Sequence, residues 1–119
     1  MKLENEVEAE IARFLHKLYW RRYRNHVGQI DSADGATRVI GKRGTPDWTY
    51  RRTISGQRGR VEILHVECKR EGHTPYQDGE RGKGQLERIA SLNAIGEPAC
   101  WANSLEMFEL WYWTQGFAP

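Results

Sequence analysis

The sequence feature that most constrains the fold is residues 61–69, where apolar and polar side chains alternate. A period of two predicts a β-strand with one buried face. Because side chains two positions apart share a face of a strand, Glu67 and Lys69 point the same way. A Pro46-Asp47 pair precedes the neighbouring strand-like run and would bring a second carboxylate to the same place. Two carboxylates and a lysine are the minimum set for metal-assisted cleavage of a phosphodiester.

The strand-like run at residues 48–54 and the polar turn at residues 55–60 predict an antiparallel hairpin with residues 61–69. One face of the second strand then carries Leu64, Val66 and Cys68, and the other carries Ile63, His65, Glu67 and Lys69. A lone histidine on a strand is more often structural than catalytic, so His65 is not assigned to the site.

The remaining elements follow from apolar spacing and from helix-ending residues. Apolar residues at helical spacing predict helices at residues 3–23 and 85–95, the second ended by Gly96. Residues 98–102 are typical of a buried strand, and Asn103 or Ser104 would cap a last helix that runs to Trp111. The link at residues 25–44 contains a β-like run at residues 37–40. Residues 70–84 are too polar and glycine-rich to build a core element.

The predicted order is therefore helix, three strands, helix, strand, helix. This order predicts an α/β fold with a central mixed β-sheet flanked by helices. At 119 residues, the chain is expected to form a single domain over residues 1–119.

The net charge says little about what the protein binds, whereas the positions of the charged residues say more. The net charge is only +2, but basic residues cluster at residues 21–24, 42–43, 51–52, 58–60 and 69–70. Interleaved aromatic residues make these clusters suitable for nucleic acid, although an ordinary solvated surface also has this pattern. Two cysteines without zinc-type spacing, an acidic start and no long apolar run indicate a protein of the reducing cytoplasm.

Together, Pro46-Asp47 and Glu67-Cys68-Lys69 resemble the signature of the restriction-endonuclease-like superfamily, which is Pro-Asp, a gap and (Asp/Glu)-x-Lys. Within it the chain is similar to the VRR-NUC family, a small replication-repair nuclease domain that occurs alone in phages. The similarity includes residues 4–7 in the opening helix, residues 42–47 before the first strand, and the helix led by Gln85. This resemblance covers nearly the whole chain and implies a restriction-endonuclease-like nuclease domain.

The resemblance implies an Mg²⁺ or Mn²⁺ site. Asp47 and Glu67 would bind the ion, with the main-chain carbonyl of Cys68 completing the protein ligands. Glu4 would supply a carboxylate from the first helix, directly or through water, and Glu8, one turn further on, is the alternative.

Two polar residues are assigned to the chemistry around that ion. Lys69 would orient the attacking water or stabilise the charge of the transition state. Gln85 would position water or Lys69. The link after the first helix and the segment after Lys69 are longer than in the family, and the second contains a competing Thr74-Pro75-Tyr76-Gln77 motif. Gln85 is preferred to Gln77 because it is in register with the apolar residues of its helix.

The implied substrate is branched DNA, with a Holliday junction favoured and the enzyme acting as a homodimer. A flap or duplex nuclease and a non-catalytic DNA-binding module are the alternatives. Small standalone members of the family point to a phage or bacterial protein. The predicted contacts to backbone phosphates are Lys42, Arg43, Arg58, Arg60 and Arg70.

Overall fold

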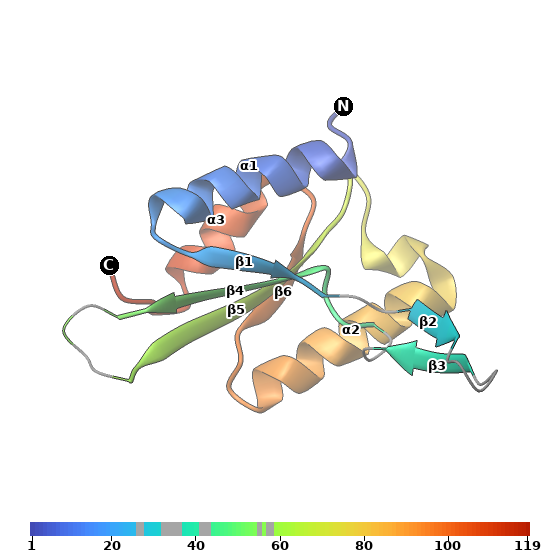
Figure 1. Cartoon of the computed structure of the whole chain (residues 1–119). Helices are drawn as coiled ribbons and strands as arrows, with labels where there is room; N and C mark the ends of the chain where they lie inside the picture. Colours follow the sequence, from blue (N-terminus) through green and yellow to red (C-terminus); the bar gives the residue numbers. More distant parts are fainter. Residues whose placement is uncertain (26–27, 32–36, 41–43, 55, 57–58) are drawn as a thin grey trace.

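The computed structural model describes residues 1–25, 28–31, 37–40, 44–54, 56 and 59–119. Its elements are α1 (Glu4–Lys17), β1 (Arg21–Arg24), β2 (Gly28–Asp31), β3 (Thr37–Ile40), β4 (Trp48–Thr53), β5 (Val61–Cys68), the 3₁₀ helix η1 (Pro75–Gln77), α2 (Gly79–Ala94), β6 (Ala99–Ala102) and α3 (Leu105–Trp113). Four strands form a mixed sheet in the order β1-β4-β5-β6, in which β5 and β6 are parallel and the other neighbours antiparallel. Helices α1 and α3 cover one face and α2 covers the other (Figure 1). The predicted α/β class with a central mixed sheet is confirmed.

The larger core lies between the sheet and the helices α1 and α3. Leu64, Val66 and Cys68 of β5 are buried there, as the alternation predicts. Val7, Ile11 and Leu15 of α1 meet them because residues four apart lie on one face of a helix. In α3, Phe108 and Tyr112 are buried, and the Trp20 indole donates to the Tyr112 hydroxyl at 3.0 Å. No described helix is long and apolar enough to cross a lipid bilayer.

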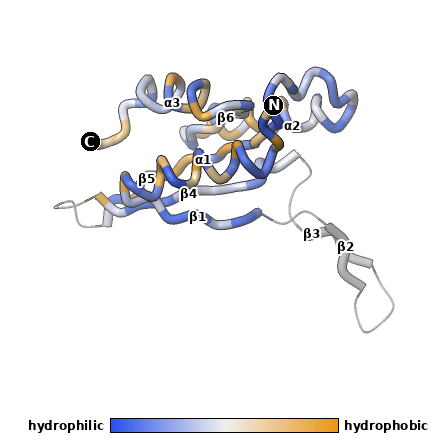
Figure 2. The backbone as a smooth tube through the Cα atoms, turned by 90° about the horizontal axis from the view of Figure 1, so that it is seen from above, coloured by the Kyte–Doolittle hydropathy of each residue, from blue (hydrophilic) through white to orange (hydrophobic). Residues whose placement is uncertain are grey.

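The prediction of one helix over residues 3–23 is wrong after Lys17. Tyr19 adopts a left-handed backbone conformation, with φ 69°, and reverses the chain. Residues Arg21–Arg24 then pair with β4 as the edge strand β1. Figure 2 shows β1 as a hydrophilic margin of the sheet. The sequence Arg-Arg-Tyr-Arg lacks the apolar alternation that identifies a half-buried strand, so periodicity gave no signal here.

The link at residues 25–44 holds two strands where one was predicted. The β-like run at residues 37–40 is β3, and it pairs with β2, which was not predicted, in a separate antiparallel hairpin.

The prediction that residues 70–84 build no core element is also wrong. Helix α2 begins at Gly79, six residues before Gln85, and η1 precedes it. Thr74 and Gln77 form a reciprocal capping box, in which the Thr74 N–H donates to Gln77 Oε1 at 2.7 Å. Pro75 is fully buried against α2. At the other end of the chain the Ser104 cap is confirmed, because its Oγ accepts from the Met107 N–H at 3.0 Å.

The packing of η1 on α2 depends on the glycine at position 82. A Cβ added to Gly82 would lie 1.7 Å from the Pro75 carbonyl oxygen, so Gly82→Ala should lower the free energy of unfolding by about 1–3 kcal/mol. Gly84→Ala is the matched control, because an added Cβ at Gly84 meets nothing within 4 Å and alanine favours a helix. Urea denaturation of both variants measures the difference. Equal losses in the two variants would contradict this account of the packing.

Candidate active site

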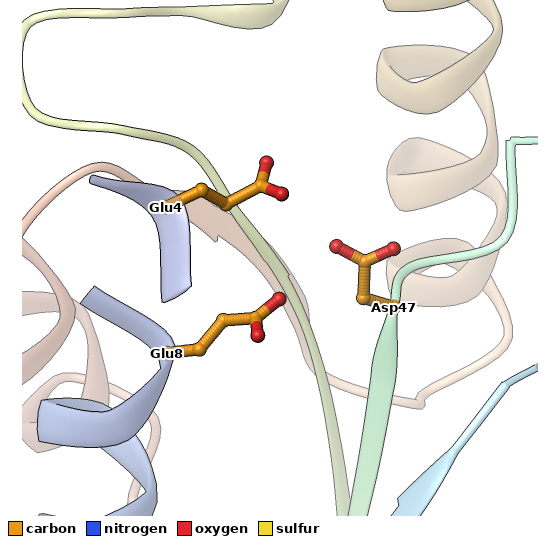
Figure 3. A group of neighbouring side chains, drawn as sticks. All are labelled: Glu4, Glu8 and Asp47. Atoms are coloured by element: carbon orange, nitrogen blue, oxygen red, sulfur yellow. The ribbon is translucent and has the colours of Figure 1, made fainter. Parts of the chain in front are cut away.

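Three carboxylates from two elements meet where the chain enters β4. One oxygen each of Glu4, Glu8 and Asp47 lies within 4.8 Å of the other two (Figure 3). Glu4 and Glu8 are four residues apart on α1, so they stand one above the other on the same face. The prediction from the sequence gives Glu4 and Glu8 as alternatives, whereas the structure places both beside Asp47. We call Glu4, Glu8 and Asp47 the acidic group.

The acidic group is electrostatically unfavourable without a counter-charge. Partial burial raises the pKa of Glu4 and of Glu8, and the negative charge of Asp47 raises both further. Burial also raises the pKa of Asp47. Several carboxylate oxygens at one point are the donor set that Mg²⁺ and Mn²⁺ prefer, and a bound cation would remove the repulsion. The residues present therefore fit a divalent metal ion.

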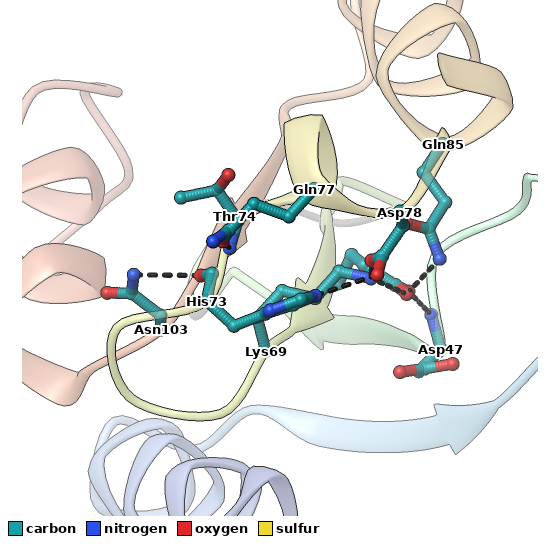
Figure 4. A network of polar contacts seen from close by, with 9 residues as sticks. Asp47, Lys69, His73, Thr74, Gln77, Asp78, Gln85 and Asn103 are labelled. Atoms are coloured by element: carbon teal, nitrogen blue, oxygen red, sulfur yellow. Dashed lines mark hydrogen bonds and ion pairs between the residues drawn. The ribbon is translucent and has the colours of Figure 1, made fainter. Parts of the chain in front are cut away.

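Glu67 lies directly behind Asp47 and is almost inaccessible to solvent, with 2% of its surface exposed. Its Oε2 accepts a hydrogen bond from the Asp47 backbone N–H at 2.9 Å, and its Oε1 accepts one from Gln85 Nε2 at 2.6 Å (Figure 4). The Lys69 ammonium lies 3.8 Å from Oε1. Four residues predicted for the site, Asp47, Glu67, Lys69 and Gln85, are therefore in contact through one carboxylate. Burial, and then the charge of Asp47, raises the pKa of Glu67 to about 8.

Lys69 has a second and closer partner that the sequence interpretation missed. Its Nζ donates to Asp78 Oδ2 at 2.7 Å, and Asp78 Oδ1 lies 2.7 Å from His73 Nε2. Asn103 Nδ2 donates to the His73 carbonyl oxygen at 3.0 Å and fixes that loop. The hydrogen bond from Lys69, followed by that from His73, lowers the pKa of Asp78 to about 2. Asp78 therefore stays ionised and holds the ammonium in place.

A cleft of about 660 Å³ opens beside this network, and its lining includes Asp47, Glu67 and Gln85. Gln85 is 96% buried, since only 4% of its surface is exposed. Its Oε1 has no hydrogen-bond partner among the described residues. A buried oxygen without a donor costs free energy, so a water or ligand that donates a hydrogen bond is expected at this position.

Two further candidates from the sequence are the main-chain carbonyl of Cys68, as a metal ligand, and Gln77, as the alternative to Gln85. The thiol of Cys68 faces the core, where burial raises its pKa, so only its main-chain carbonyl remains a candidate ligand. Gln77 is exposed and serves the capping box of η1, which leaves Gln85 at the site.

Of the five predicted phosphate contacts, the structure describes two, Arg60 and Arg70. Lys42, Arg43 and Arg58 lie outside the described residues. Arg60 is exposed next to the first residue of β5, and Glu67 is near its last. Seven residues of strand correspond to about 23 Å, so Arg60 is far from the carboxylates. Arg70 is exposed directly after Lys69.

His65 is a structural residue, as the sequence interpretation favours. Its Nδ1 lies 2.9 Å from Thr49 Oγ1 and its Nε2 lies 3.1 Å from Glu97 Oε1. Asn25 Nδ2 donates to the same Thr49 oxygen at 2.7 Å. This chain of hydrogen bonds satisfies the buried polar atoms of β4 and β5 on the face of the sheet that α2 covers.

No protein-family model, curated protein or solved structure matches this chain.

Proposed function

We propose that this protein is a metal-dependent endodeoxyribonuclease that hydrolyses phosphodiester bonds in branched DNA. The observation that carries the proposal is the contact of Asp47, Lys69 and Gln85 with one buried carboxylate, Glu67, beside the acidic group. Glu67, which lines the cleft, and Lys69 are both buried, and burial of such charged groups is costly for stability alone and is common at catalytic sites.

The ion would be held by Asp47 with Glu4 and Glu8, while Glu67 orients Asp47 through its backbone N–H. When bound, Mg²⁺ or Mn²⁺ lowers the pKa of a coordinated water and neutralises charge on the phosphate.

The polar residues supply the other requirements of the hydrolysis. The free Oε1 of Gln85 accepts a hydrogen bond from the attacking water in the cleft. The ammonium of Lys69, held by Asp78, stabilises the negative charge that develops on the phosphate oxygens.

The proposed substrate is a four-way junction that is cut by a homodimer. A junction presents two symmetry-related strands, and each chain supplies one candidate site, so two chains related by a two-fold axis match the substrate. We propose Mg²⁺ or Mn²⁺ as the cofactor, and a bacterial or phage-encoded cytoplasmic protein as the setting.

The test is cleavage of end-labelled junction, flap and linear duplex DNA in parallel with Mg²⁺, with Mn²⁺ and with EDTA. We expect paired, symmetry-related nicks in the junction that EDTA abolishes. Faster cleavage of flap or duplex DNA would change the proposed substrate but leave the proposed metal-dependent hydrolysis intact. DNA binding without cleavage under either metal would identify a non-catalytic module and overturn the proposal.

A further inference from the structure

The edge strand β1 carries a concentration of positive charge that the proposed chemistry does not use. All four of its residues, Arg21–Arg24, are exposed. Its neighbour β4 adds Arg51, which pairs with Arg21 in the antiparallel register, so these two arginines lie on one face of the sheet edge and Arg22 and Arg24 on the other. We call Arg21, Arg22, Tyr23, Arg24 and Arg51 the arginine strip. We infer that the arginine strip binds the phosphate backbone of the DNA strand that enters the cleft, an inference that rests on the proposed nuclease function.

Aromatic rings, and not ion pairs with carboxylates, support three of the four guanidinium groups of the strip. Arg22 and Arg24 lie over the Trp48 ring, at 4.4 and 5.3 Å from its centroid. Arg51 lies 5.8 Å from the centroid of Tyr23. Cation–π stacking orients a guanidinium without neutralising it, so its donors stay available to phosphate oxygens.

The neighbouring Arg52 shows what a structural arginine in this sheet looks like. Its Nη2 lies 2.8 Å from Glu62 Oε1, and its guanidinium lies over Trp20 at 4.7 Å. Among the described side chains, no ion pair joins any arginine of the strip to a carboxylate. Arg22 and Arg24 lie near enough to the acidic group to lower the pKa of Glu8, but without an ion pair the four cations on two adjacent strands still repel one another, and a polyanion would relieve that repulsion.

The strip is continuous with the candidate active site. Arg24 and Asn25, at the end of β1, line the cleft together with Asp47 and Glu67. From Arg21 to Arg24 the strand extends about 10 Å, which matches about three nucleotides of a stacked strand. A backbone lying along β1 would therefore be led towards the carboxylates.

A second copy of this chain is a less suitable partner than DNA for the exposed edge of β1. An exposed sheet edge can pair with another strand, but two β1 strands side by side would bring arginines opposite arginines. The charge of the strip therefore favours DNA over self-association.

The test is fluorescence anisotropy of a labelled four-way junction in EDTA, where no cleavage occurs. The double variants R22Q/R24Q and R21Q/R51Q should each weaken binding about tenfold or more. Each should also reduce the slope of log K against log salt by about two, because two phosphate contacts are lost. Lys83→Gln is the matched control, because Lys83 is exposed and lies about 160° around α2 from Gln85.

Several results would overturn the inference: no binding by wild type, an unchanged affinity and salt slope in both double variants, or an equal loss in Lys83→Gln. Sedimentation that shows dimers of wild type and monomers of the variants would also overturn it, by assigning the edge to self-association. Thermal unfolding checks that each variant is folded. Because these measurements need no turnover, failure of the nuclease proposal appears separately, as normal binding without cleavage when metal is added.

Discussion

Asp47→Asn should lower the rate of Mg²⁺-dependent cleavage by about a thousandfold or more while leaving the protein folded. Asp47 is the residue that connects the acidic group to the network around Glu67. Loss of a metal-binding carboxylate removes several kcal/mol of transition-state stabilisation, and each 1.36 kcal/mol corresponds to a tenfold change in rate. The backbone N–H that donates to Glu67 remains in the variant, so the neighbouring geometry is preserved. Single-turnover cleavage with saturating Mg²⁺ measures the effect.

The glutamates of α1 provide the controls for this experiment. Glu4→Gln and Glu8→Gln remove charges from the acidic group, so both should raise the Mg²⁺ concentration needed for half-maximal cleavage. Glu6→Gln removes an exposed charge on the same helix from outside that group and should not change it. A full rate for Asp47→Asn, or an equal metal requirement in all three glutamate variants, would remove the acidic group from the mechanism.

The sequence predicts the centre of the fold better than its margins. Residues 61–69 could be assigned because β5 is largely buried and its apolar side chains, which α1 and α3 cover, alternate with polar ones. This alternation is visible in the sequence. At β1 no such signal exists, since an edge strand of four exposed residues buries nothing that composition could reveal. The start of α2 was missed because its glycines have low helix propensity, which the packing of Pro75 on Gly82 overrides.

The part of the candidate site that lies next to paired strands could be predicted from the sequence, and the part that comes from loops and from α1 could not. Glu67 lies in β5, Lys69 directly follows it and Asp47 directly precedes its partner β4, so the pairing of the two strands brings these three residues close together. Asp78 and His73 reach Lys69 from the segment between β5 and α2, and no periodicity fixes the path of such a segment. The meeting of Glu4 and Glu8 with Asp47 depends on how α1 packs across the sheet, which spacing within either element does not determine.

Glu67→Gln should slow cleavage, because glutamine has one acceptor oxygen for the two hydrogen bonds that Glu67 accepts from Asp47 and Gln85, and yet make the folded protein more stable at pH 8. In the unfolded chain the carboxyl loses its proton near its ordinary value of 4.5, whereas in the folded protein burial and the charge of Asp47 raise the pKa of Glu67 to about 8. The folded state therefore binds the proton of Glu67 more tightly, so the contribution of this group to stability is fully present below pH 4.5 and is lost as the pH rises towards 8. The loss at pH 8 is of the order of a few kcal/mol.

Thermal unfolding between pH 5 and pH 8.5 measures this dependence. The wild-type midpoint should fall across the range, and Glu67→Gln should flatten the fall, because glutamine keeps an acceptor oxygen without the charge. Glu87→Gln, an exposed glutamate of α2, should retain the wild-type slope. Mg²⁺ should raise the wild-type midpoint more at pH 8 than at pH 5, since protons and the cation compete for the same carboxylates. A wild-type midpoint that rises with pH would mean that Glu67 gains more from Lys69 and its hydrogen bonds than it loses by burial. The buried charge of Glu67 would then not be destabilising, and Glu67→Gln would not stabilise the protein at pH 8.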